Sequence, residues 1–205
     1  MRISREHPLL LASASPRRRE LLELARIPFE VVRAGADESV APNERPAVYV
    51  ARVARAKLAA AAVALDEDAR ARGAVILAAD TTVVVDGAIL GKPKDDDDAR
   101  AMLRALSGRA HEVMTAFALG DPATARLLYE ESVTTRVEMR ALDAGEIDAY
   151  VATGEPRDKA GAYAIQGMAS ALVRRIEGSH TNVIGLPTAE LVVALRRLES
   201  AGRDR

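Results

Sequence analysis

Several polar side chains stand where they could bind a phosphate group. The segment Ser13-Ala-Ser-Pro-Arg-Arg18 follows a short apolar run and opens a stretch with helical signals. Free N–H groups at a helix N-terminus attract an anion, and arginine adds forked donors. Ser15 and Pro16 are equally suited to an ordinary helix cap. The spacing alone therefore leaves two interpretations, a phosphate site or a cap with solvated arginines.

Asp80 is the strongest candidate for a catalytic group. It follows the apolar run 74–79, which we expect to be a buried strand that ends at Ala79. A carboxylate beside the core is costly unless it binds a metal, accepts hydrogen bonds or takes part in chemistry. There it could take a proton from water or hold Mg²⁺ near a phosphate. We favour this role over simple capping of the corner that leads into a predicted hairpin at 81–90.

Two later segments have the composition of binding loops. Lys92 and Lys94 lie in a proline-stiffened turn that can aim a lysine at a phosphate, although the preceding glycine spacing does not fit a Walker loop. Residues 154–161 are dense in charge and glycine, which is typical of a binding loop. Gln166 follows, next to apolar Ile165. We expect its amide to be buried and to need partners that a ligand could supply.

Other apparent motifs have simpler explanations. The acidic run 95–98 could suggest magnesium, but its place before a predicted helix favours capping of the helix N-terminus. His7, His111 and His180 are scattered, so we expect surface or hydrogen-bonded histidines. The chain has no cysteine, which excludes disulfides, thiolate metal sites and cysteine nucleophiles.

The elements that position these side chains can be predicted from the sequence, in which segments with the apolar pattern of a strand alternate with segments that have the pattern of a helix. We expect a mixed-sheet α/β fold, with the sheet flanked by helices, in a single domain over residues 1–205 that can have two lobes. The expected strands are 8–13, 29–32, 74–79, 81–85, 88–90, 111–119, 126–139 and 172–177. The expected helices are 16–25, 46 to the middle sixties, 95–106, 143–153 and 187–201.

Composition limits the class of protein. The chain has 205 residues, 49% of them hydrophobic, and a formal net charge of -1 from 29 basic and 30 acidic residues. This balance lacks the basic footprint of a protein that binds nucleic acid. The apolar run 9–12 is too short for a secretory signal, and no stretch approaches the ~20 apolar residues of a membrane span. We expect a cytoplasmic protein with neither a nucleic-acid nor a membrane partner.

Taken together, these segments closely resemble the Maf family of nucleotide pyrophosphatases. The matching stretches, in the family's order, are residues 11–22, 78–81, 91–93, 154–167 and 183–187. The resemblance implies a mixed α/β sheet with a central cleft, similar to the fold of the inosine triphosphate pyrophosphatases, and a homodimer. It also implies a nucleoside triphosphate substrate, and it points to the dTTP/UTP branch of the family.

The resemblance also assigns roles to individual residues. It makes Asp80 the proton acceptor and, with Glu38, the partner of a divalent cation, Mg²⁺ with Mn²⁺ as the alternative. The residues placed around the triphosphate are Ser13, Arg17, Arg18, Lys57, Lys92 and Lys159. The residues placed at the base are Arg17, Thr81 and Gln166.

Three functions remain open at this point. The first is hydrolysis of dTTP and UTP, with modified pyrimidine nucleotides as further substrates, to the monophosphate and pyrophosphate. The second is the same chemistry on 7-methyl-GTP or on a broad set of nucleotides. The third is a non-catalytic nucleotide-binding regulator of septum formation. The presence of Asp80 and Lys92 argues against the third, because a pure binder has no need of a general base.

Overall fold

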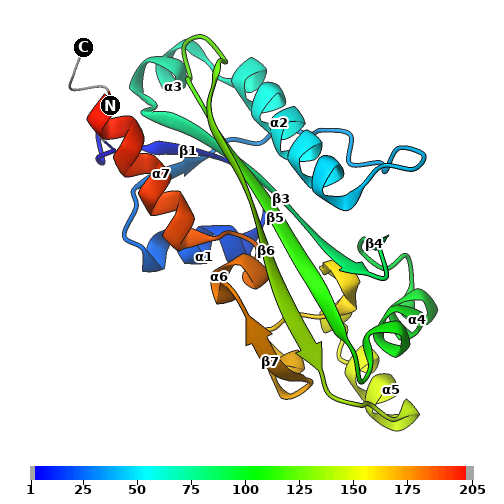
Figure 1. Ribbon diagram of the computed structural model, residues 1–205. Coiled ribbons are helices and arrows are strands. Elements are labelled where there is room, and N and C mark those ends of the chain that lie inside the picture. Colours follow the sequence, from blue (N-terminus) through cyan, green and yellow to red (C-terminus); the bar gives the residue numbers. More distant parts are fainter. Residues whose placement is uncertain (1–2, 202–205) are drawn as a thin grey trace.

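A seven-stranded mixed sheet runs through residues 3–201, the part of the chain that the computed structural model describes (Figure 1). The strand order is β2-β1-β3-β5-β6-β7, and β4 pairs with β3 outside this path. β1 is parallel to β2 and β3, whereas the other pairs are antiparallel. The strands are β1 (Leu9–Ala12), β2 (Phe29–Val31), β3 (Val75–Val85), β4 (Ala88–Leu90), β5 (Ala110–Gly120), β6 (Leu127–Met139) and β7 (Val173–Glu177). The expected mixed α/β fold is confirmed.

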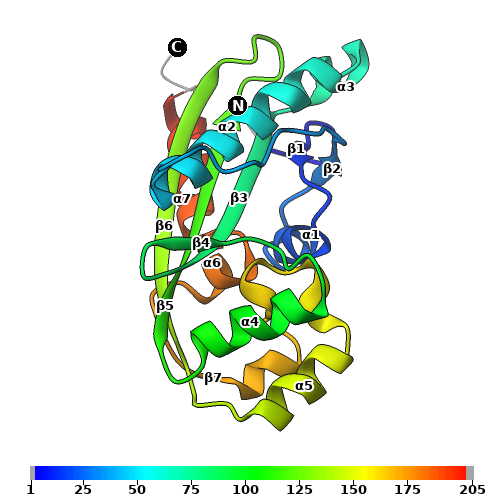
Figure 2. The same ribbon diagram turned by 90° about the vertical axis from the view of Figure 1, so that its right-hand side faces the viewer.

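Helices cover both faces of the sheet. α2 lies along β3 and β5 on one face, while α1, α6 and α7 lie on the other; α4 and α5 sit near the end that carries β7 (Figure 2). The α-helices are α1 (Pro16–Leu24), α2 (Pro46–Ala64), α3 (Glu67–Arg72), α4 (Asp96–Leu106), α5 (Ala144–Ala152), α6 (His180–Ile184) and α7 (Thr188–Ala201). Three 3₁₀ helices, η1 (Glu155–Asp158), η2 (Ala160–Ala162) and η3 (Met168–Ala171), lie between α5 and β7.

Alternation along β3 divides the core into two layers. Ile76 and Ala78 pack with the apolar residues of α2, and Leu77 packs in the larger cluster on the opposite face. Because successive side chains of a strand point to opposite faces, Asp80 faces α2 and Thr81 faces the side of α1 and α6. This parity decides which neighbours each of the two polar residues meets.

The expected strand end at Ala79 is wrong, because β3 continues without a break to Val85. Asp80 lies in the middle of this strand. Along one edge, β3 pairs with β1 only as far as Ala78 and with β4 only from Val83. The polar residues therefore mark a gap in strand pairing at residues 79–82. The change from apolar to polar residues at Asp80 therefore marks the end of the neighbouring strand β1, and not the end of β3.

The short elements were missed. α3 and α6 were not expected, and the predicted loop 154–161 contains the turns of η1 and η2. Side-chain caps mark the missed helices: Asp66 accepts from Ala69 N at 2.7 Å, and Ser179 accepts from Asn182 N at 3.3 Å. The capping role of the acidic run is confirmed, since Asp95 accepts from the N–H of Asp98 at 2.8 Å.

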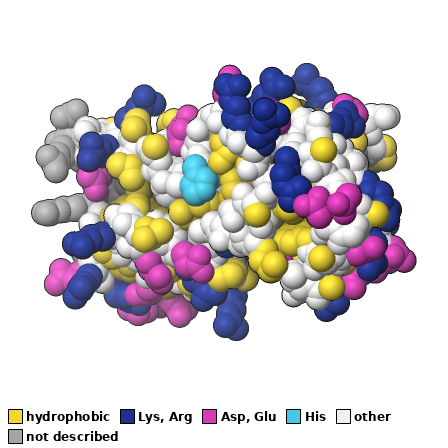
Figure 3. Space-filling view, turned by 90° about the horizontal axis from the view of Figure 1, so that it is seen from below, with side chains coloured by type: hydrophobic (Ala, Val, Ile, Leu, Met, Phe, Trp, Pro, Cys, Tyr) yellow, Lys and Arg dark blue, Asp and Glu magenta, His cyan; other side chains and the backbone are white. Residues whose placement is uncertain are grey.

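On the face seen in Figure 3, Lys and Arg side chains gather along part of the upper edge, and Asp and Glu side chains lie beside them and over the rest of that face. No helix within residues 3–201 combines the length and the apolar character needed to cross a membrane.

A buried contact fastens the segment after η2 to the sheet. Nε2 of His111, on β5, lies 2.7 Å from the Tyr163 hydroxyl, and the two rings meet edge to face. Both side chains are buried. Burial lowers the pKa of His111 to about 4 and raises the pKa of Tyr163.

The burial of His111 makes stability depend on pH. Between about pH 6.5 and pH 4 the unfolded chain binds a proton at His111 and the folded chain does not. We therefore expect the free energy of unfolding, measured with urea, to fall by up to about 3 kcal/mol as the pH falls through this window. His111→Gln should flatten this dependence, and His7→Gln, at an exposed position, should keep it. Equal slopes in all three proteins would contradict the assignment.

Candidate functional site

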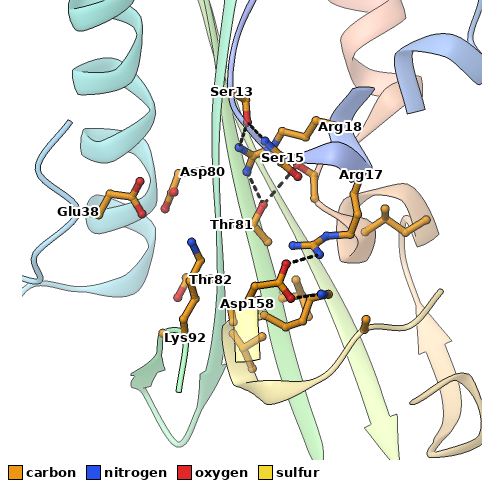
Figure 4. A pocket seen from close by; sticks show the side chains of 18 of the residues that line it. Ser13, Ser15, Arg17, Arg18, Glu38, Asp80, Thr81, Thr82, Lys92 and Asp158 are labelled. Atoms are coloured by element: carbon orange, nitrogen blue, oxygen red, sulfur yellow. Dashed lines mark hydrogen bonds and ion pairs between the residues drawn. The ribbon is translucent and has the colours of Figure 1, made fainter. Parts of the chain in front are cut away.

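A pocket of about 560 Å³ opens at the gap in β3 pairing (Figure 4). Its volume is in the range of small-molecule sites. All the site residues expected from the sequence line it, namely Ser13, Arg17, Arg18, Glu38, Lys57, Asp80, Thr81, Lys92, Lys159 and Gln166. They come from the β1–α1 junction, the loop before α2, α2 itself, β3, the segment after β4 and the loop between α5 and β7. The fold thus gathers positions that are far apart in the chain.

Asp80 is held in an ion-pair cluster on the α2 side of β3. Lys57 Nζ lies 2.8 Å from Asp80 Oδ1 and 2.8 Å from Glu38 Oε1. Only 6% of the Asp80 side chain is exposed, against 48% for Glu38. Burial opposes ionisation of Glu38, but the hydrogen bond and charge of Lys57 and the charge of Lys92 outweigh it and lower its pKa. The sequence did not suggest that a helix lysine would be so nearly enclosed.

The same carboxylates fit a divalent cation. Oxygen ligands suit Mg²⁺, which proteins often bind through one or two carboxylates together with substrate phosphates. Asp80 and Glu38 approach a common point, because both contact the same ammonium group. Within residues 3–201 there is no group of three or more His, Cys, Asp or Glu side chains able to hold a metal. The donor set therefore matches a cation that substrate phosphates help to coordinate.

Arg18 joins three elements on the other side of β3. Its Nε donates to Gly185 O at 2.8 Å, Nη1 to Ser13 Oγ at 3.0 Å, and Nη2 to Thr81 Oγ1 at 3.1 Å. Burial lowers the pKa of Arg18, and the charge of Asp80 partly offsets this effect. Figure 4 shows Asp80 and Glu38 on one side of the strand and Arg18 and Thr81 on the other. Three predicted site residues are thus one hydrogen-bonded unit.

Two buried residues that support this unit were missed. Thr115, opposite Thr81 in the β3–β5 register, places Oγ1 2.9 Å from the Thr81 hydroxyl and donates to Asn182 O at 3.1 Å. Both Thr115 and Asn182 are fully buried. The paired threonines on two expected strands were the available signal for Thr115. For Asn182 the local sequence offered no signal, because the partners of its side-chain amide, Val113 O and Thr135 Oγ1, lie far away in the chain.

Asp158 is a further pocket residue that the sequence did not single out. Its carboxylate lies 3.6 Å from Arg17 Nη1 and also forms an ion pair with Lys159 (Figure 4). Burial opposes its ionisation, but Lys159 and Arg17 outweigh burial and lower its pKa. An acidic residue therefore links two of the cations expected at the triphosphate.

The segments that carry Lys92 and Lys159 are fastened together. Gly161 N donates to Gly91 O at 3.0 Å, and Gly161 adopts φ 68°, where a Cβ would lie 2.9 Å from the Val83 side chain. Glycine meets both demands, because it tolerates the left-handed conformation and the close approach. Lys92 is exposed at the pocket.

The expected burial of the Gln166 amide is wrong, whereas the N-cap position of Ser15 is confirmed. Gln166 is exposed, because the turn at its position buries Ile165 and directs the chain outward. Ser15 occupies the N-cap position of α1, but its side chain makes no capping hydrogen bond. Its N–H donates instead to Ser13 Oγ at 3.2 Å.

Comparisons with known proteins identify the family of this chain. The family model for Maf-like protein matches residues 8–198. A dTTP/UTP pyrophosphatase of Geobacter sp. (strain M21) is 52% identical over 194 residues, which cover 95% of this chain and 97% of the relative. Another, from Geotalea uraniireducens (strain Rf4), is 50% identical over 190 residues, or 93% and 94% of the two chains. A solved HAM1 protein from Coxiella burnetii has 17% identity and a TM-score of 0.49, covering 97% of this chain and 100% of that chain. Since the family match takes in the sheet, the pocket and nearly the whole sequence, this chain belongs to the Maf-like protein family.

Proposed function

We propose that this protein hydrolyses dTTP and UTP to the nucleoside monophosphate and pyrophosphate. Relatives that are 50% and 52% identical to this chain over nearly its full length carry the name dTTP/UTP pyrophosphatase. The observation that carries the proposal is a nearly enclosed carboxylate, Asp80, in a pocket where basic side chains converge from separate elements. Those side chains are Arg17, Arg18, Lys57, Lys92 and Lys159.

The proposed chemistry follows from the charges. The basic side chains offset the charge of the triphosphate and stabilise the leaving pyrophosphate. Asp80 orients a water molecule and accepts its proton as the water oxygen attacks the α-phosphorus. The bond from the α-phosphorus to the bridging oxygen then breaks, and that oxygen leaves with pyrophosphate.

A divalent cation, Mg²⁺ or alternatively Mn²⁺, is part of the proposal. Asp80 and Glu38 would hold it, and when bound it would supply further neutralisation of phosphate charge. Lys57 already spans the two carboxylates and offsets one of their two negative charges. The chain's own contribution is thus a pair of carboxylates that one ammonium keeps close together.

Base recognition is assigned to the part of the pocket formed by Arg17, Thr81 and Gln166. The exposed amide of Gln166 has both a donor and an acceptor, which match the N3–H and a neighbouring carbonyl of uracil or thymine. Triphosphate contacts carry no information about the base, so preference must come from these residues.

A homodimer in the cytoplasm completes the proposal. The family resemblance supports both, and the absence of cysteine fits a reducing compartment.

Replacing the proposed base tests the chemistry directly. Asp80→Asn should reduce turnover of UTP by about 10²-fold or more, in the range for loss of a positioned base. Binding should persist, because the basic side chains remain. Asp86→Asn is the matched control, since Asp86 lies just beyond β3 and pairs with Arg109. A near-normal rate for Asp80→Asn would remove Asp80 from the mechanism.

The metal requirement is tested with and without a chelator. We expect EDTA to abolish hydrolysis, Mg²⁺ to restore it, and ³¹P NMR to show pyrophosphate and no orthophosphate in the first turnovers. Glu38→Gln should raise the Mg²⁺ concentration needed for half-maximal rate. Glu44→Gln should not, because Glu44 pairs with Arg52 and does not line the pocket. Unchanged activity in EDTA would contradict the metal role.

Gln166→Glu tests base preference. An ionised glutamate cannot donate to a pyrimidine carbonyl, so the replacement loses one of the two hydrogen bonds that the Gln166 amide can make to uracil or thymine. UTP and dTTP should therefore lose kcat/KM disproportionately, and guanine-type substrates should gain if any substrate does. Kinetic constants for UTP, dTTP, CTP and 7-methyl-GTP decide the matter. Equal losses on all four would show that Gln166 only supports its loop.

A further inference from the structure

Tyr150 and Glu155 form a hydrogen-bonded pair beside the pocket wall. The Tyr150 hydroxyl, at the end of α5, donates to Glu155 Oε1 at 2.7 Å and accepts from Ala164 N at 3.3 Å. The Glu155 carboxylate accepts from Met168 N at 2.9 Å and from Ala169 N at 3.3 Å. The pair therefore binds the main chain at both ends of residues 164–169.

The segment held in this way is a tight turn with Gln166 at its tip. Gly167 N donates to Ala164 O at 2.9 Å and closes the turn. Ile165 is buried in the core, whereas Gln166 is exposed and lines the pocket. Gly167 lies so close to Glu155 that an added Cβ would overlap the carboxylate. The turn and the pair are consequently fitted to each other.

The carboxylate is well suited to hold main-chain donors. Burial opposes ionisation of Glu155, but its hydrogen bonds from Met168 and Tyr150 outweigh burial and lower its pKa. Hydrogen bonds to an ionised acceptor are stronger than neutral ones. The hydrogen bonds that fix the turn involve Ala164, Met168 and Ala169 and not Gln166, so the direction of the Gln166 side chain depends on the residues on either side of it.

We propose that Tyr150 and Glu155 are positioning residues that set the base preference of the pocket, by fixing the turn that presents Gln166. This inference rests on the proposed function for its substrate. Neither side chain is among the residues that line the pocket, so their effect passes through the turn. Replacing either residue should therefore weaken binding of the base and should not change binding of the triphosphate.

The test measures the contribution of the base to binding separately from that of the phosphate groups. Affinities for α,β-methylene UTP and for inorganic tripolyphosphate are measured by calorimetry in the wild type, Tyr150→Phe and Glu155→Gln. Both variants should bind the nucleotide analogue about tenfold more weakly, as expected for loss of a charge-assisted hydrogen bond. Tripolyphosphate affinity should stay within about twofold, because none of the proposed triphosphate residues is among the hydrogen-bond partners of the pair. In turnover, KM for UTP should rise far more than kcat falls.

Tyr129→Phe is the matched control, because its hydroxyl also donates to a carboxylate, Glu131 at 2.6 Å, on β6. It should change neither affinity. Glu155→Gln keeps an acceptor oxygen, so it tests the inference even if Tyr150→Phe folds poorly. Equal losses for both ligands, or no loss for the nucleotide analogue, would overturn the inference, as would a wild type that binds the analogue no better than tripolyphosphate. A wild type that binds the analogue but releases no pyrophosphate would instead overturn the proposed function.

Discussion

The ion pair between Lys57 and Asp80 is the interaction on which the pocket depends. Asp80 stands in the middle of β3 as the only charged residue of that strand, and only 6% of its side chain is exposed. A carboxylate at such a position requires a nearby positive charge or hydrogen bonds. Lys57 supplies both from α2, at 2.8 Å. The packing of α2 on the sheet and the chemistry of the pocket therefore depend on each other, because the helix that covers the core also supplies the positive charge that pairs with the Asp80 carboxylate.

The arrangement on either side of β3 explains how one pocket can hold two kinds of chemistry. Asp80 faces α2, with Lys57 and Glu38, while Thr81 faces Arg18 on the opposite side. In a fully paired sheet these faces would be separated by backbone. Between β1 and β4 the edge of β3 is open, so a ligand placed there can reach both sides. The carboxylate and the arginine unit then act on the same molecule.

The sequence predicted the main elements because their signals are local. Alternating or continuous apolar runs marked the strands, and capping signals such as Ser15 with Pro16 and the acidic run from Asp95 marked helix starts. The continuity of β3 could not be predicted in the same way, since it depends on unbroken pairing with β5, a strand that lies much later in the chain. The role of Lys57 was also out of reach of spacing arguments, because a lysine on an Ala-rich helix looks the same whether it is solvated or paired. It came from the family resemblance.

The open edge of β3 has a consequence for how such a pocket can change over evolutionary time. Alternate residues within 79–82 offer their peptide groups at that edge, since the others pair with β5, and no substitution other than proline removes a main-chain N–H. This part of the pocket is thus inherited with the fold, whatever side chains drift around it. The loops that carry Lys92, Lys159 and Gln166 are free to vary by comparison. New substrates can then be acquired by loop changes alone, on a strand edge that stays constant.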